Sequence, residues 1–363
     1  MNLGKSSSAN NGSSIEIAPE ADYKQKRLRN ISFLIGLFAL LVVSVLVSLR
    51  AGSYDTPTLE LVRGILGKAH DPKINTIVIN NRLPRILTAL ISGAGLGISG
   101  CVLQAILRNP LASSSTLGVS QGAGFGAAFA IIVLNAGVSA GAGAAAIPLC
   151  AFAGSMAVAF TILGLSKISR VTPEGIVLAG VAISSIFTGA TTLIQYFANE
   201  IQLATLVFWT FGNLGSTDMR EILMMSAVIF PASAYFFYHR WDYNALLSGT
   251  ETAVSLGINV SRLTLINMIV CCFVASTIVS NIGLIAFIGL VAPHLVRLVV
   301  GNNHVYLLPG SMLGGATLLL LGDLFSRIAI SPIILPIGAI TSFLGGPLFL
   351  YLLFKGGSRR AES

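Results

Sequence analysis

The side chains best suited to chemistry are a few charged groups beside apolar runs. Asp323 and Arg327 are four residues apart near the end of one run, and Arg82 and Arg85 flank Pro84 at the start of another. Residues four apart share one face of a helix, so Asp323 and Arg327 can pair. Guanidinium groups bind carboxylates through paired hydrogen bonds, so the three arginines could receive the carboxylates of a protein partner. Contact with lipid headgroups is the alternative.

Motifs for catalysis are missing from the sequence. It has no GxxxxGK[ST] loop for nucleotide phosphates, no HExxH zinc motif and no GxSxG nucleophile elbow. The four histidines form no ligand cluster, and the four cysteines lie in apolar runs without a CxxC pair. We therefore expect neither an enzyme nor a bound cofactor or metal. We interpret His294 as a packed or gate-lining residue rather than a proton relay.

The composition indicates a membrane protein. Hydrophobic residues make up 54% of the chain and charged residues only 10%, whereas soluble domains are about 25% charged. Apolar runs of ~20 residues recur, each long enough to cross a bilayer as a helix. The basic residues behind the net charge of +8 lie mostly at the ends of these runs, which favours membrane orientation over nucleic-acid binding.

Ten candidate spans predict an all-α, polytopic fold. An even number puts both termini on one side, and the Lys and Arg distribution favours the cytoplasm for that side. Two halves, 84–197 and 263–354, would run in opposite directions, as in inverted-repeat transporters. We expect a disordered cytoplasmic tail over 1–29, one transmembrane domain over 30–356 and a second cytoplasmic tail over 357–363. The spans are about 30–49, 84–107, 116–134, 143–166, 174–197, 219–238, 263–281, 283–300, 306–326 and 336–354.

Two outer connections are too apolar for free loops. In 199–215, aromatic residues around Trp209 predict a partly inserted or interfacial segment. In 50–85, Thr56-Pro57 suits a helix start, and an apolar stripe predicts a short surface helix. The stripe consists of Leu59, Val62, Ile65 and Leu66.

The connection between 219–238 and 263–281 carries a signal for another short helix. Ser248 and Glu251 have the spacing of a capping box, and Gly257 suits the left-handed residue that ends a helix. A helix this short is marginal alone, so something must hold it. A ledge for a soluble partner and an ordinary ordered loop are equally good interpretations.

Glycine spacing marks a close-packing face in one span. Gly118, Gly122 and Gly126 are four residues apart and allow another backbone to approach closely. Ser120 and Gln121 lie beside them at membrane depth. They either line a path or bond to a neighbouring helix.

Two prolines predict interruptions. Asn109-Pro110 predicts a sharp return after a span, because proline cannot extend a helix. Pro293-His294 predicts a second break, inside an apolar run. The preceding span also carries a glycine stripe, at Gly93, Gly97 and Gly100.

Seven short motifs in order resemble the permease subunits of type II, binding-protein-dependent ABC importers for ferric siderophores, haem and cobalamin. The likeness covers about residues 30–356. The motifs are Arg82-Leu83-Pro84-Arg85, Arg108-Asn109-Pro110-Leu111-Ala112, Leu117-Gly118-Val119-Ser120, Leu178-Ala179-Gly180-Val181-Ala182, Phe287-Ile288-Gly289-Leu290-Val291-Ala292-Pro293-His294, Leu307-Leu308-Pro309-Gly310 and Leu335-Pro336-Ile337-Gly338.

The resemblance implies a homodimer around one central path, in the lipid of the cytoplasmic membrane of a bacterium or an archaeon. Two ATP-binding ABC subunits, which hold the ATP and Mg²⁺, would sit below, and an extracytoplasmic substrate-binding protein would dock from outside on Arg82, Arg85 and Arg327. Coupling helices at about 244–261 would contact the ATPase through Asn244, Ser248, Gly249, Thr250, Glu251, Ala253, Leu256 and Gly257. The path or gate would include Asn109, Pro110, Gly118, Ser120, Gln121, Pro293 and His294.

The chain departs from the family pattern at several positions. Ser113 and Ser114 stand where an acidic residue and proline are common, and Ile334 replaces a frequent glutamate. Thr250 also replaces a common acid, which leaves Glu251 as the only carboxylate of the coupling helix. The motifs do not distinguish siderophore, haem and cobalamin as cargo, and base rate alone favours an iron chelate.

Two other classes of protein were weighed. An ion-coupled secondary transporter with inverted repeats would need carboxylates at mid-membrane, and few acids lie within the spans. A membrane-embedded enzyme would need a polar cluster, and the sequence shows none.

Overall fold

A computed structural model describes residues 17–51, 58–65, 67–137, 143, 145–168 and 173–361. Within these ranges seven helices are long and apolar enough to cross a membrane, and three shorter apolar helical segments accompany them. The predicted all-α, polytopic fold is therefore confirmed. The helices are α1 (Ile17–Arg50), α2 (Thr58–Ile65), α3 (Pro72–Ile77), η1 (Val78–Arg82), α4 (Leu83–Ile106), α5 (Val119–Ala128), η2 (Phe129–Val133), α6 (Ala146–Ile168), α7 (Pro173–Gln195), α8 (Glu200–Thr210), α9 (Met219–Tyr238), α10 (Arg240–Leu247), α11 (Thr250–Ser255), α12 (Val260–Ile282), α13 (Ile288–Val300), α14 (His304–Ile328) and α15 (Ile337–Ala361).

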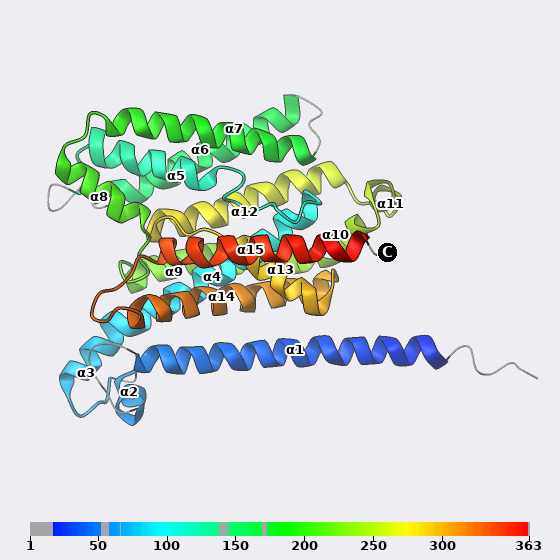
Figure 1. Ribbon diagram of the computed structural model, residues 1–363, viewed down its shortest axis with the longest axis horizontal. Coiled ribbons are helices and arrows are strands. Elements are labelled where there is room, and N and C mark those ends of the chain that lie inside the picture. Colours follow the sequence, from blue (N-terminus) through cyan, green and yellow to red (C-terminus); the bar gives the residue numbers. More distant parts are fainter. Residues whose placement is uncertain are drawn as a thin grey trace, which may run out of the picture.

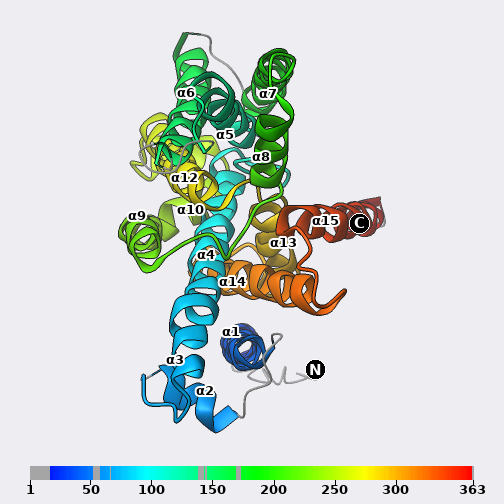
Figure 2. The same ribbon diagram turned by 90° about the vertical axis from the view of Figure 1, so that its left-hand side faces the viewer.

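The long helices lie side by side along one direction (Figure 1). The start of α1, the end of α15 and the short helices α10 and α11 lie at one end of the bundle, here called the α11 end. Helices α2 and α3 lie at the opposite end, called the α2 end (Figure 1). Seen from the α2 end, α7 and α15 lie along one side of the bundle and α9 lies on the other (Figure 2).

Helix α4 is the centre of the core, and its glycine stripe makes this possible. A Cβ on Gly93 would lie 2.5 Å from the carbonyl oxygen of Gly315 on α14, and a Cβ on Gly97 would overlap the carbonyl of Ser311. The stripe on α5 works the same way, since a Cβ on Gly122 would lie 2.5 Å from the Gly154 oxygen on α6. Both stripes are helix-packing faces, as the spacing predicted.

The predicted break at Pro293-His294 is wrong, because Pro293 lies inside α13. The interruption comes earlier, over 283–287, and α13 begins after Phe287 in a left-handed conformation with φ 67°. Proline in the second turn of a helix removes only one main-chain bond, the one to the Gly289 carbonyl. That carbonyl packs directly on Gly100 of α4, where a Cβ would overlap it.

The tail boundaries also differ from the prediction. Residues 17–29, expected to be disordered, form the first turns of α1, and residues 357–361 continue α15. Residues 1–16 lie outside the described part of the chain. Helices α1 and α15 both extend beyond the apolar runs from which the spans were predicted.

Both connections that were predicted to be structured contain a helix. Helix α2 confirms the short surface helix, and Leu61 packs there with Ile74 and Val78 in a small buried cluster. Helix α8 forms in the aromatic connection and starts with a capping box between Asn199 and Gln202. The side chains of the predicted stripe on α2 lie outside the described residues.

Candidate functional site

The loop between α9 and α12 folds into two short helices at the α11 end. Gly249, with φ 110°, is the N-cap of α11, and Gly257, with φ 83°, follows its end as predicted. The predicted capping box is wrong. Ser248 ends α10 instead, and its carbonyl accepts a hydrogen bond from Thr252 at 3.1 Å. The sharp turn at Gly249 separates the two helices, so the Ser248 hydroxyl caps neither.

Helix α11 presents apolar side chains outward. Ala253 is its one buried residue, whereas Leu247, Val254 and Leu256 are 52%, 57% and 66% exposed. Glu251 lies exposed among them. We call these four residues, Leu247, Glu251, Val254 and Leu256, the coupling surface. Leu247 ends α10, Val254 lies on α11 and Leu256 is its C-cap, and exposed large apolar side chains on neighbouring short helices are typical of a protein-binding surface.

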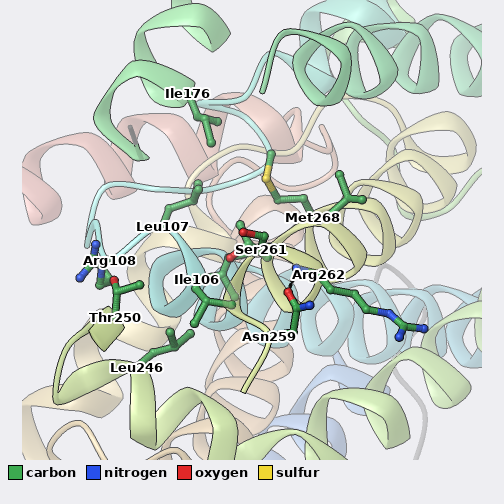
Figure 3. Close-up of a pocket in the computed structure, with 13 residues that line it drawn as sticks. Ile106, Leu107, Arg108, Ile176, Leu246, Thr250, Asn259, Ser261, Arg262 and Met268 are labelled. Carbon is green, nitrogen blue, oxygen red and sulfur yellow. Dashed lines mark hydrogen bonds between the residues drawn. The ribbon is translucent and has the colours of Figure 1, made fainter. Parts of the chain in front are cut away.

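A groove of about 640 Å³ lies next to α11 (Figure 3). Apolar side chains from α4, α10 and α12 form much of its wall, and Thr250 of α11 lines it. Arg108 and Arg262 project on opposite sides of the groove (Figure 3), and both are exposed. The predicted site residues did not include either arginine; the signal for Arg108 was its place directly before Asn109-Pro110.

Asn244 does not face outward with the coupling surface. Its side-chain oxygen accepts hydrogen bonds from the His304 main-chain N–H at 2.8 Å and from His304 Nδ1 at 3.0 Å. The neighbouring Tyr243 is fully buried and donates to Asn267 Oδ1 of α12 at 2.6 Å. Burial raises the pKa of Tyr243, so the hydroxyl keeps its proton. These contacts hold α10 against α12 and α14.

The sharp return after α4 is present. Arg108 has a positive φ of 46°, and Asn109 Oδ1 accepts from the Leu111 N–H at 2.9 Å. Pro110 is exposed, and Gly118 starts α5 with φ 81°. The chain between them folds back into the bundle, because Leu117 is fully buried.

Hydroxyl groups line a second groove, of about 520 Å³, on α7 and the segment before α5. Ser120 Oγ lies 3.5 Å from Ser115 Oγ, which belongs to this groove, and Gln121 Oε1 is buried without a hydrogen-bond partner in the described structure. His294 lies elsewhere, against Phe349 of α15 at 6.4 Å between ring centroids. The sequence interpretation missed most of the groove, which is lined by Leu111, Ser115, Thr116, Val177, Val181, Ser184, Ser185 and Thr188.

The arginines predicted to dock a partner lie within a network at the α2 end. Asp323 is fully buried and pairs with Arg85 at 2.7 Å and with Arg327 at 3.0 Å. Arg327 also donates to the Ala51 carbonyl, and Arg82, 7% exposed, donates to the Leu49 carbonyl at 2.8 Å. The predicted Asp323–Arg327 pair is therefore present. Docking by these arginines stays a prediction, and the structure gives all three of them internal partners.

The seven candidate spans among the described residues indicate a multi-pass membrane protein. The chain belongs to the FecCD transport family, whose model matches residues 40–355. It is a permease subunit of an ABC importer of that family, a translocation component rather than an enzyme. The family implies ATPase and binding-protein partners.

Similar proteins cover nearly the whole chain. A Methanocaldococcus jannaschii protein named "Putative ABC transporter permease protein" is 47% identical over 92% of this chain and 97% of its own. The hemin transport system permease protein of Yersinia pestis is 34% identical, and the match covers 87% of this chain and 95% of the relative. The vitamin B12 import system permease protein of Escherichia coli is 35% identical, and the match covers 92% of this chain and 98% of the relative.

Two solved structures share the fold. One, described as "an inward-facing conformation of a putative metal-chelate type ABC transporter", has a TM-score of 0.78 and 32% identity, and covers 89% of this chain and 99% of that one. The other, PsaBC from Streptococcus pneumoniae in complex with Fab, has a TM-score of 0.54 and covers 80% of this chain and 95% of that one. At 16% identity it shows the fold alone.

Proposed function

We propose that this chain moves a metal chelate, an iron chelate in the first place, into the cytoplasm, driven by ATP hydrolysis on two partner subunits. The observation that carries the proposal is the coupling surface. Three large apolar side chains and Glu251 are exposed on the short helices α10 and α11 and the C-cap of α11, at one end of a membrane bundle. Such a surface needs a protein partner to cover it.

The α11 end would then face the cytoplasm, with both termini on the same side. Helices α7 and α15 share one side of the bundle and expose large apolar residues, among them Leu178, Leu193 and Phe343. A second copy packed on this side would enclose the hydroxyl-lined groove next to the subunit interface. A path lined by hydroxyls and without charges suits a cargo that must bind weakly and pass on.

The ion-coupled carrier is disfavoured by the state of Asp323. Its carboxylate is fully buried and bonded to two arginines, so it offers no free site for a proton or sodium ion.

The first test is affinity purification of the tagged chain from native membranes, with an assay of vanadate-sensitive ATP hydrolysis. Glu251→Lys should reduce the co-purifying ATPase about tenfold, because it reverses the only charge on the coupling surface. Glu200→Lys is the matched control, since Glu200 is an exposed acid in the first turn of α8 at the α2 end. Equal recovery of ATPase with both variants would contradict the assignment.

Cargo is tested separately in proteoliposomes that contain the complex and its binding protein. Uptake of a ferric siderophore, hemin and vitamin B12 is measured with each compound competing against the others. The names of the relatives make hemin and vitamin B12 the natural competitors. Uptake of none of the three would contradict a metal-chelate cargo.

A further inference from the structure

Helix α14 connects the coupling region with the opposite end of the bundle. Its 25 residues span roughly 36 Å at 1.5 Å per residue. It is hydrogen-bonded at both ends. At its start it bonds to the Asn244 side chain of α10, and near its last turns it bonds to the Arg85 side chain of α4 and, through its own Arg327, to the Ala51 carbonyl just after α1.

The start of α14 is bonded to α10 through one side chain. Asn244 accepts two hydrogen bonds from His304, and its amide donates to Asn303 Oδ1 at 3.0 Å. Because an amide oxygen only accepts, the ring proton of His304 lies on Nδ1. His304 is 1% exposed, and its Nε2 has no partner among the described residues. We call these contacts the Asn244 joint.

Tyr243, the residue before Asn244, also holds α10 in place. Its ring lies edge-on to His304 at 5.6 Å, and its hydroxyl donates to Asn267 of α12. Moving α10 relative to α14 would break the two partly buried bonds to His304, whose side chain is itself buried. An unsatisfied buried polar group costs about 1–3 kcal/mol. A displacement of α10 therefore moves the start of α14 with it.

The middle of α14 is locked against α4. Gly93 and Gly97 bring the α4 backbone into contact with Gly315 and Ser311. Packed interiors of this density transmit displacement instead of absorbing it. Helices α4 and α14 thus behave as one rigid body.

The far end of this body carries the α2-end network. Asp323 bonds α14 to Arg85 of α4, and Arg327 donates to the carbonyls of Ser48 and Ala51 at the end of α1. The two ends of the body therefore belong to the two faces of the bundle, one with the coupling surface and one opposite it.

We propose that α4 and α14 form a rigid lever that carries displacement of the coupling helices to the α2 end, and that Asn244 is the positioning residue at its joint. The proposal rests on the proposed function, since it requires an ATPase that moves α10 and α11. Asn244 would then act by holding α10 to α14, and not by contact with the ATPase as the sequence predicted.

The test uses the complete complex in proteoliposomes. ATP hydrolysis is measured with and without the substrate-binding protein on the α2 side, and the ratio of the two rates is the stimulation. A rigid connection transmits displacement in both directions, so the lever also carries a displacement at the α2 end inward to α10. Asn244→Leu breaks this connection and should therefore abolish the stimulation.

Two variants separate the joint from general damage. In Asn244→Asp a side-chain oxygen can still accept both hydrogen bonds from His304. Stimulation of ATP hydrolysis in this variant should therefore stay within about twofold of the parent. Asn281→Leu makes the same replacement at an asparagine whose amide donates to Thr277 and Ser280 of its own helix. This control should leave the stimulation unchanged. A merely structural role of Asn244 would instead lower complex yield while the stimulation stayed the same.

The outcomes distinguish the lever from the proposed function. If no ATPase assembles with the parent chain, the proposed function fails. If the parent assembles but shows no stimulation, or if Asn244→Leu is stimulated as strongly as the parent, the lever alone is overturned. Should Asn244→Leu not assemble, Asn244→Ala replaces it, since it removes the same three hydrogen bonds without adding bulk. Parental stimulation of Asn244→Ala would then overturn the lever.

Discussion

Replacing Asp323 by alanine should destabilise the α2 end more than any exposed acidic substitution. The carboxylate is fully buried and bonds to Arg85 and Arg327, whose side chains are 14% and 10% exposed. Removing it leaves two buried guanidinium groups without their anion. The loss of one partner of a buried ion pair costs roughly 3–5 kcal/mol.

The midpoint of thermal unfolding converts this cost into a measurement. With an unfolding entropy of about 2 cal/mol/K per residue and 363 residues, the midpoint should fall on the order of 5 °C. The assay is thermal unfolding of the purified chain in detergent. Asp323→Asn keeps one acceptor oxygen, so its midpoint should lie between those of the parent and Asp323→Ala.

Asp218→Ala is the matched control. Asp218 caps α9 by accepting from the main-chain N–H groups of Arg220 and Glu221, and it is exposed. Loss of such a cap costs about 1 kcal/mol, so this variant should lose only about a quarter as much stability. If Asp323→Ala and Asp218→Ala had the same midpoint of thermal unfolding, the buried charge of Asp323 would not hold the α2-end network together, and the reasoning would be refuted.

Three further predictions follow from other contacts. Gly97→Leu should abolish recovery of folded protein, because no side chain fits between α4 and α14; normal recovery on size-exclusion chromatography would contradict this packing. Tyr243→Phe should cost about 1–3 kcal/mol in thermal unfolding, since it leaves the buried Asn267 oxygen without its donor. A hydrogen bond from the His70 main-chain N–H is the main cause that lowers the pKa of Glu60 below the ordinary value of a glutamate. This contact therefore stabilises the folded form fully at pH values above that ordinary pKa, and the effect is lost as the pH falls through the lower pKa of the folded form. Limited proteolysis of the α2–α3 region should accelerate in that acid range, and Glu60→Gln should remove the pH dependence.

Element positions were predictable where local patterns decide them. The glycine stripes at Gly93, Gly97 and Gly122 identified packing faces, because only helix–helix contact explains that spacing in an apolar run. The short helix ending at Gly257 was also predictable, since a left-handed residue has a clear signal. Hydropathy located the spans but not their ends, since α1 and α15 continue beyond the predicted spans and α13 begins five residues later than predicted.

Tertiary partners were not predictable from the letters. Asp323 and Arg327 are four apart, so their pairing was expected, but Arg85 lies 238 residues from Asp323. For the same reason the inward turn of Asn244 toward His304 was missed. The capping box at Ser248 failed because a spacing rule does not say which of two adjacent helices a residue belongs to.

The part of the chain around α13 cannot reach its final place in the membrane before the helices that surround it are present. Helix α13 has 13 residues, roughly 20 Å, against a hydrocarbon core of ~30 Å. The irregular stretch 283–287 before it is tolerated at that depth only inside protein. Its surroundings are built by Asn213, which donates to the Ile282 carbonyl, and by Gly338, which donates to the Phe211 carbonyl. Because Gly338 belongs to α15, which is synthesised after all the helices from α1 to α14, this part of the bundle matures only once α15 has been made.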